Sequence, residues 1–151
     1  MTYIEWFNQH AKKHKTIVDK LVAKGYSKEQ IIEYFDFDNM VNAEPAFCLL
    51  YQEKKKCHEM EKLNCYLCAC PYFRFDDEGL GIYNEFKILS KCDIHNGKEF
   101  ATGNTIHHDC SSCSVPHHKA FVEKNFNLDW KKIMSDCHTE LENSNNTHEN
   151  S

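Results

Sequence analysis

Cysteine and histidine are concentrated in the middle of this chain, and this concentration limits what the chain can fold into. Fourteen of the 71 residues from 48 to 118 are Cys or His. We expect a cytoplasmic protein, because the N-terminus lacks the apolar segment of a secretory signal. Lasting disulfides are rare in the reducing cytosol, and an odd total of nine cysteines cannot all pair within one chain. Metal binding is therefore the first interpretation of these residues.

The strongest local pattern is the sequence CYLCACP at positions 65–71. Its CxxC pair, Cys65 and Cys68, is typical of a zinc knuckle, a tight turn whose two thiolates bind one ion. Cys70 lies two residues farther on, and in an extended segment its side chain need not face the ion of Cys68. The pattern therefore indicates a second metal ion or a cluster of ions that share thiolates.

A second CxxC pair supplies the remaining ligands. Cys110 and Cys113 are followed by a Pro-His-His sequence at 116–118, and a lone Cys92 lies between the two pairs. A simple alternative places only the four CxxC cysteines around one ion. The full inventory instead fits two four-coordinate zinc sites, and the predicted metal ligands are Cys57, His58, Cys65, Cys68, Cys70, Cys92, Cys110, Cys113 and His117. Cys48, in an apolar run, is predicted to be a buried thiol, and Cys137 to be structural.

The flanking segments suggest three regions. Residues 1–45 are predicted to form a helical hairpin, because Thr2 with Glu5 and Ser27 with Gln30 have capping-box spacing. Residues 46–138 form the cysteine-rich domain, with short strands at 72–75 and 86–89, two turn-rich loops between 77 and 104, and a helical segment at 119–137 that Asn127 interrupts and caps. Residues 139–151 are predicted to be a disordered tail. The expected fold is a small, irregular, metal-stabilised α+β fold with two zinc-knuckle-like CxxC loops and helices at both ends.

Several of these motifs together resemble a known family. The stretches are Cys57-His58, the segment NCYLCACPY at 64–72, Cys92, and the segment CSSCSVPH at 110–117. They resemble the cysteine-rich small domain family, described as a metal-binding domain, over roughly residues 47–125. The resemblance implies metal ligation by the cysteines and histidines of these stretches.

The favoured function is a zinc-binding module with one or two ions and a structural, protein-docking or metal-handling role. The alternatives are a metal-dependent enzyme with an open site, an iron–sulfur redox protein, and a metal carrier or sensor. The candidate residues of the open site are His107, His108, Asp109, His117 and His118. The sequence contains no HExxH, zinc-deaminase or phosphate-loop motif and assigns no catalytic residue. An enzyme is therefore the less favoured reading.

Charge limits the choice of partner. The net charge is −5, and residues 48–121 carry nine Lys or Arg against ten Asp or Glu. Attraction to phosphates requires the opposite balance. No apolar run approaches the ~20 residues that span a bilayer. We expect a protein partner, and neither a nucleic acid nor a membrane.

Overall fold

The N-terminal helix α1, Tyr3–Ala23, begins where the sequence predicts. The computed structural model describes residues 2–110 and 113–138. The Thr2 hydroxyl accepts a hydrogen bond from the Glu5 N–H, and the Glu5 carboxylate accepts one from the Thr2 N–H, each at 3.3 Å. Gly25, with a φ of 82°, follows the helix end. The reciprocal capping box and the glycine stop are confirmed.

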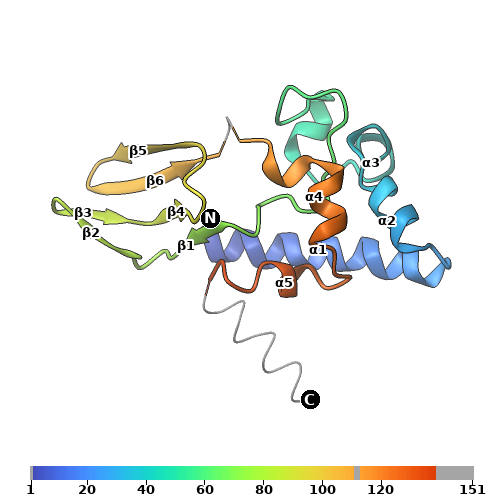
Figure 1. Cartoon of the computed structure of the whole chain (residues 1–151), viewed down its shortest axis with the longest axis horizontal. Helices are drawn as coiled ribbons and strands as arrows, with labels where there is room; N and C mark the ends of the chain where they lie inside the picture. The colour runs from blue at the N-terminus through green and yellow to red at the C-terminus, as the bar shows by residue number, and fades with distance from the viewer. Residues whose placement is uncertain (1, 111–112, 139–151) are drawn as a thin grey trace, which may run out of the picture.

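One face of α1 is buried along most of its length. The Phe7 ring lies 4.3 Å from Phe75 and 5.7 Å from Trp130 between centroids. Burying each such side chain contributes about 1.5–3 kcal/mol. The helix therefore covers apolar surface of the cysteine-rich segment, as a lid (Figure 1). Its buried apolar residues are Phe7, Ala11, Ile17, Val18 and Leu21.

The second predicted helix is two helices, α2 (Lys28–Tyr34) and α3 (Phe37–Ala43). The capping box of Ser27 and Gln30 is confirmed. The break follows from a tertiary contact: the Phe37 N–H donates to the Leu63 carbonyl, and the Cys65 N–H donates to the Phe35 carbonyl, each at 2.8 Å. Backbone groups between the helices thus hold the first CxxC segment in place. A short 3₁₀ helix, η1 (Leu49–Glu53), follows.

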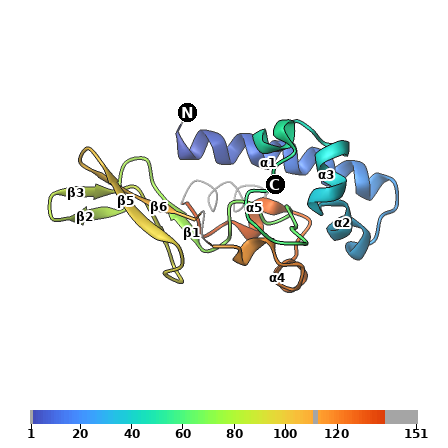
Figure 2. The ribbon, with the colours of Figure 1, turned by 90° about the horizontal axis from the view of Figure 1, so that it is seen from above.

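Two small sheets follow. Strands β1 (Phe73–Phe75) and β4 (Ser90–Cys92) pair antiparallel, with Phe73 opposite Cys92. The second sheet has the order β2-β3-β6-β5, where β3 and β6 are parallel and the other neighbours antiparallel. Its strands are β2 (Gly81–Tyr83), β3 (Phe86–Ile88), β5 (Lys98–Thr102) and β6 (Thr105–Asp109). We call this four-stranded sheet the sheet arm. It lies at the opposite end of the molecule from α2 and α3 (Figures 1 and 2).

The strand predictions are confirmed in part. The segments 72–75 and 86–89 contain β1 and β3. The chain between 77 and 109, however, also contains β2, β4 and the β5–β6 hairpin, which the sequence does not predict as strands. The hairpin turns at Gly103, whose φ of 61° suits glycine. The sequence therefore predicts the turn at Gly103 correctly but does not predict the strands β5 and β6 on either side of it.

The C-terminal segment is helical in two short pieces, α4 (Lys119–Lys124) and α5 (Trp130–Ile133), after the 3₁₀ helix η2 (Val115–His117). The prediction that Asn127 caps the last helix is wrong. The cap is Asp129, whose side chain accepts from the Lys131 N–H at 3.0 Å. Asn127 instead accepts from the Asp129 N–H at 2.8 Å and so shapes the turn before the cap.

The described residues form a mixed α+β fold with five α-helices and two small sheets, which agrees with the predicted class. Residues of the N-terminal helices share one hydrophobic core with Tyr66, Phe75 and Trp130. The predicted tail at 139–151 lies outside the described residues. In the part of the chain that the structure describes, no helix combines the length and apolarity needed to cross a bilayer.

Candidate metal centre

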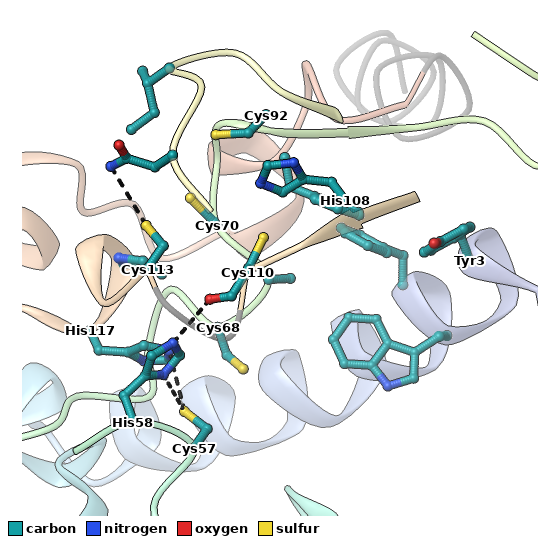
Figure 3. A pocket seen from close by; sticks show the side chains of 17 residues that line it. Tyr3, Cys57, His58, Cys68, Cys70, Cys92, His108, Cys110, Cys113 and His117 are labelled. Atoms are coloured by element: carbon teal, nitrogen blue, oxygen red, sulfur yellow. Dashed lines mark hydrogen bonds between the residues drawn. The ribbon is translucent and has the colours of Figure 1, made fainter. Parts of the chain in front are cut away.

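A cavity of about 520 Å³ lies between the start of α1 and the cysteine-rich loops. Three imidazoles line it, those of His58, His108 and His117. Its walls also contain six of the nine cysteines (Figure 3): Cys57, Cys68, Cys70, Cys92, Cys110 and Cys113. We call it the cysteine-walled cavity. Of the predicted metal ligands, only Cys65 is absent from its wall.

Three predicted ligands converge most closely, and we call Cys57, His58 and His117 the Cys57 group. Their ligand atoms all lie within 4.8 Å of one another. The Cys57 Sγ is 3.1 Å from His58 Nδ1 and 3.4 Å from His117 Nε2. In a tetrahedral zinc site, Zn–S and Zn–N bond lengths place a sulfur and a nitrogen ligand about 3.5 Å apart. The group therefore has the spacing of ligands around one ion.

The two imidazoles are turned so that a lone pair faces Cys57. His117 Nδ1 lies 2.9 Å from the Asn64 carbonyl oxygen, and His58 Nε2 lies 3.2 Å from the Cys110 carbonyl oxygen. A carbonyl oxygen only accepts, so each of these ring nitrogens donates, and in a neutral imidazole the nitrogen that faces Cys57 then carries the lone pair. Metal-binding histidines characteristically donate their second ring N–H in this way.

Asn64 positions the Cys57 group, a role that the sequence interpretation did not assign. Asn64 is 1% exposed. Its side-chain amide donates to the Ile32 carbonyl at 2.7 Å and to the Asp36 carboxylate at 2.9 Å. Its backbone N–H donates to the His117 carbonyl at 3.0 Å. This network connects the His117 ring to α2 through Asn64 and so holds the ring in place. The only sequence signal for this role of Asn64 is its position directly before the first CxxC pair.

Desolvation favours the neutral forms of two members of the Cys57 group, the buried His117 and the more exposed Cys57. Burial lowers the pKa of His117 to about 4, so this imidazole is unprotonated and able to bind a metal at neutral pH. Burial raises the pKa of the Cys57 thiol to about 11, and the neighbouring Cys48 thiol acts in the same direction. An ion bound here would have to displace the thiol proton, which makes affinity dependent on pH.

The first CxxC pair lies beside this group. The Cys68 N–H points to the Cys65 carbonyl at 3.4 Å. Burial raises the pKa of Cys65 to about 12 and raises that of Cys68 well above its ordinary value; the thiols of Cys57 and Cys48 add to both shifts. Cys48, predicted to be a buried thiol, is half-buried and close enough to interact with three of the predicted ligands. The sequence does not indicate this proximity, because Cys48 lies nine or more positions away from these ligands along the chain.

The chain reverses direction immediately after the first CxxC pair. Ala69 has a φ of 90° and Cys70 a φ of 62°. Residues other than glycine rarely adopt such left-handed values, because the Cβ atom clashes with the backbone. Such residues cost about 1–3 kcal/mol each and cluster at functional sites. The reversal separates Cys70 from Cys68 (Figure 3). The expectation that Cys70 need not face the ion of Cys68 fits this geometry.

Cys70, Cys92, Cys110 and Cys113 gather on the other side of the cavity, and we call them the four-thiol group. Burial raises the pKa of Cys110 to about 12, and the thiols of the other three add to that shift. Burial likewise raises the pKa of Cys70 to about 11, while the backbone amides of Tyr72 and Phe73 favour its thiolate. The Cys113 N–H donates to the Cys110 carbonyl at 2.9 Å, so these two cysteines lie close together.

The remaining histidines differ in their surroundings. His107 lies between the Tyr3 hydroxyl at 2.7 Å and the Thr105 hydroxyl at 3.1 Å. His118 pairs with the Ser114 hydroxyl at 3.0 Å. His108 lines the cavity, and its buried Nε2 has no hydrogen-bond partner. The histidines proposed for an open catalytic site therefore do not converge as a set, although His117 joins the Cys57 group and His108 faces the cavity.

Comparisons with known proteins find no match for this chain among protein-family models, curated proteins or solved structures. The resemblance to the cysteine-rich small domain family therefore stays a prediction from its motifs, and the functional argument depends on the geometry of the site.

Proposed function

We propose that this protein is a zinc-binding module that holds up to two ions through its cysteines and histidines. The observation that carries the proposal is the Cys57 group, in which one sulfur and two correctly oriented imidazole nitrogens lie within 4.8 Å of one another. In this proposal the two CxxC pairs of the protein act as zinc knuckles, and the bound metal stabilises the cysteine-rich segment, which has little regular structure.

Zinc fits the mixed sulfur and nitrogen donors of the Cys57 group better than an iron–sulfur cluster does. The common clusters are held by four thiolates, and replacement of cysteines by histidines is confined to special centres. Mixed thiolate and imidazole ligation, as in the Cys57 group, suits zinc. The CxxCxC spacing of residues 65–70 also differs from that of bacterial ferredoxins.

The role that we favour is structural, with docking of a protein partner. The sheet arm exposes large apolar side chains, with Ile82 78% and Tyr83 64% exposed on β2 and Phe100 48% exposed on β5. These side chains lie on the two edge strands of the sheet, where they are available for contact with a protein partner. The acidic net charge argues against a nucleic acid as the partner.

A metal-dependent enzyme is the second candidate, favoured by the cavity itself. Tyr3, Trp6 and Phe73 form an aromatic wall beside the candidate ligands. An ion held by the three ligands of the Cys57 group would keep a fourth position for water or substrate. Addition of azide to the cobalt-substituted protein distinguishes the candidates: a spectral change indicates an open position, and an unchanged spectrum indicates a closed structural site.

Elemental analysis and a visible spectrum of untagged protein test the zinc proposal. We expect zinc and no colour, and iron with sulfide and a brown spectrum would overturn the proposal. His117→Gln should lose bound zinc. His118→Gln is the matched control, because this neighbour pairs with Ser114 and lies outside the Cys57 group. Equal zinc content in both variants would exclude His117 as a ligand.

A further inference from the structure

We propose that the four-thiol group of Cys70, Cys92, Cys110 and Cys113 is a second, separate site that binds a zinc ion through four thiolates. This inference rests on the proposed function and deepens it, because it divides the ligands between two ions of different donor chemistry. The Cys57 group, with the first CxxC pair beside it, is the nitrogen-containing site, and the four-thiol group is the all-sulfur site.

The fold brings these four thiols together from three separate segments. Cys70 precedes β1, Cys92 ends β4, and the pairing of these strands sets Phe73 opposite Cys92. The Asp93 N–H donates to the Tyr72 carbonyl at 3.0 Å, which extends this pairing toward Cys70. The second CxxC turn follows β6, which contacts β4 through the hydrogen bond from the His108 N–H to the Ser90 hydroxyl at 2.7 Å.

The direction of the side chains separates the two sites. The left-handed backbone at Ala69 and Cys70 turns the chain over between the two cysteines at 68 and 70. As a result, the Cys70 sulfur lies among those of Cys92, Cys110 and Cys113, while Cys68 is on the side of Cys57 and His117 (Figure 3). The electrostatic neighbours agree: Cys70 and Cys110 interact with members of the four-thiol group, and Cys65 and Cys68 interact with Cys57.

Hydrogen-bond donors already face the sulfurs of the four-thiol group. The Tyr72 backbone amide favours the Cys70 thiolate, and Asn96 Nδ2 donates to Cys113 Sγ at 3.7 Å. Donors of this kind stabilise thiolates and orient them toward a metal. Four thiolates around a divalent ion leave a net charge of −2, which these N–H groups partly compensate.

The geometry argues against the arrangement in which both CxxC pairs share one ion. Cys68 and the second CxxC pair lie on different sides of the cavity, and Cys65 is absent from its wall (Figure 3). In this division the ligands of one site flank those of the other along the chain, since the four-thiol group lies between the first CxxC pair and His117. The Cys110 carbonyl, which accepts from His58 Nε2, links one site to the other. Filling the all-sulfur site therefore helps to orient His58 for the other ion.

Cadmium-113 NMR of the full chain loaded with ¹¹³Cd²⁺ tests this division, because the chemical shift reports the number of sulfur ligands. We expect two ions per chain and two resonances, one from all-sulfur ligation and one from mixed sulfur and nitrogen ligation. Cys92→Ser should abolish the first resonance and one ion, and His117→Gln should abolish or shift the second. His118→Gln is the matched control, because this imidazole pairs with the Ser114 hydroxyl and belongs to neither group.

The outcomes separate the two proposals. One ion with a mixed resonance alone would overturn the second site and leave the proposed function intact. One ion with an all-sulfur resonance alone would support the four-thiol group and exclude the Cys57 group as a zinc site. A single ion lost on substitution of either Cys68 or Cys113 would favour the shared CxxC site, and absence of bound cadmium would overturn both proposals.

Discussion

The inner face of α1 and the cysteine-walled cavity both draw side chains away from solvent, but the side chains on α1 are mostly apolar and those of the cavity include metal-binding thiols and imidazoles. The helix buries aliphatic and aromatic side chains, which gain free energy on leaving water without further partners. The cavity wall gathers thiols and imidazoles, and removing the thiol protons there becomes favourable when a cation binds. Under the proposed function, packing alone holds the helical end, whereas metal ligation adds to the packing of the cysteine-rich end.

Metal removal is the strongest way to break this comparison. Structural zinc contributes about 10–16 kcal/mol of apparent binding energy in small zinc domains. After chelation we expect amide hydrogen exchange to accelerate most in residues 57–75 and 90–110, and least in α1. Re-addition of zinc should restore the slow exchange. Equal exchange of the cysteine-rich segment with and without metal would show that packing holds both ends.

A cavity in the helical core sharpens the comparison from the other side. Leu21 is fully buried on α1, so Leu21→Ala should lower the free energy of unfolding by about 2–5 kcal/mol. Zinc content of the folded protein should not change, because Leu21 does not line the cysteine-walled cavity. Val22→Ala is the control: Val22 is 46% exposed, and the change should stay within about 0.5 kcal/mol. Urea unfolding of both variants with metal analysis provides the measurement, and loss of zinc from Leu21→Ala would show that the two regions depend on each other.

Acid should affect the helical core as well as the metal ligands, through two buried histidines on α1. Burial lowers the pKa of His10 to about 4 and that of His14 to about 3, from 6.5. The folded state therefore binds fewer protons than the unfolded state. Stability is complete above pH 6.5 and is lost as the pH falls from 6.5 toward 4.

His10→Phe isolates this contribution. The His10 ring packs against Trp6 and Phe47, each 4.8 Å away, and its Nε2 has no hydrogen-bond partner, so a phenyl ring suits the site. Between pH 7 and pH 5 the wild type should lose about 2 kcal/mol more than the variant. Metal release on acidification is common to both proteins and cancels in the difference. Parallel pH dependence of urea unfolding would contradict a neutral, buried His10.

Local sequence signals predicted the helical end well, and the cysteine-rich end less well. The capping boxes at Thr2 and Ser27 were predictable because each involves residues three positions apart. The break between α2 and α3 was not, because it arises from backbone pairing with residues 63–65. For the site, the sequence identified the ligand types, but the grouping of Cys70 depends on the left-handed turn at Ala69, which no local rule requires of an alanine.

The smallest test concerns the α2 end, where packing and capping act without any metal ligand. The Ser27 hydroxyl accepts from the Gln30 N–H at 3.2 Å, and the Gln30 side chain accepts from the Ser27 N–H at 2.8 Å. Ser27→Ala should cost about 1 kcal/mol because it removes one of these bonds, whereas Ser27→Gly should cost only a few tenths of that. Thermal unfolding at saturating zinc measures both. Since α2 also contacts Asn64 through the Ile32 carbonyl, a fall in zinc affinity on Ser27→Ala would show that even this remote cap supports the Cys57 group.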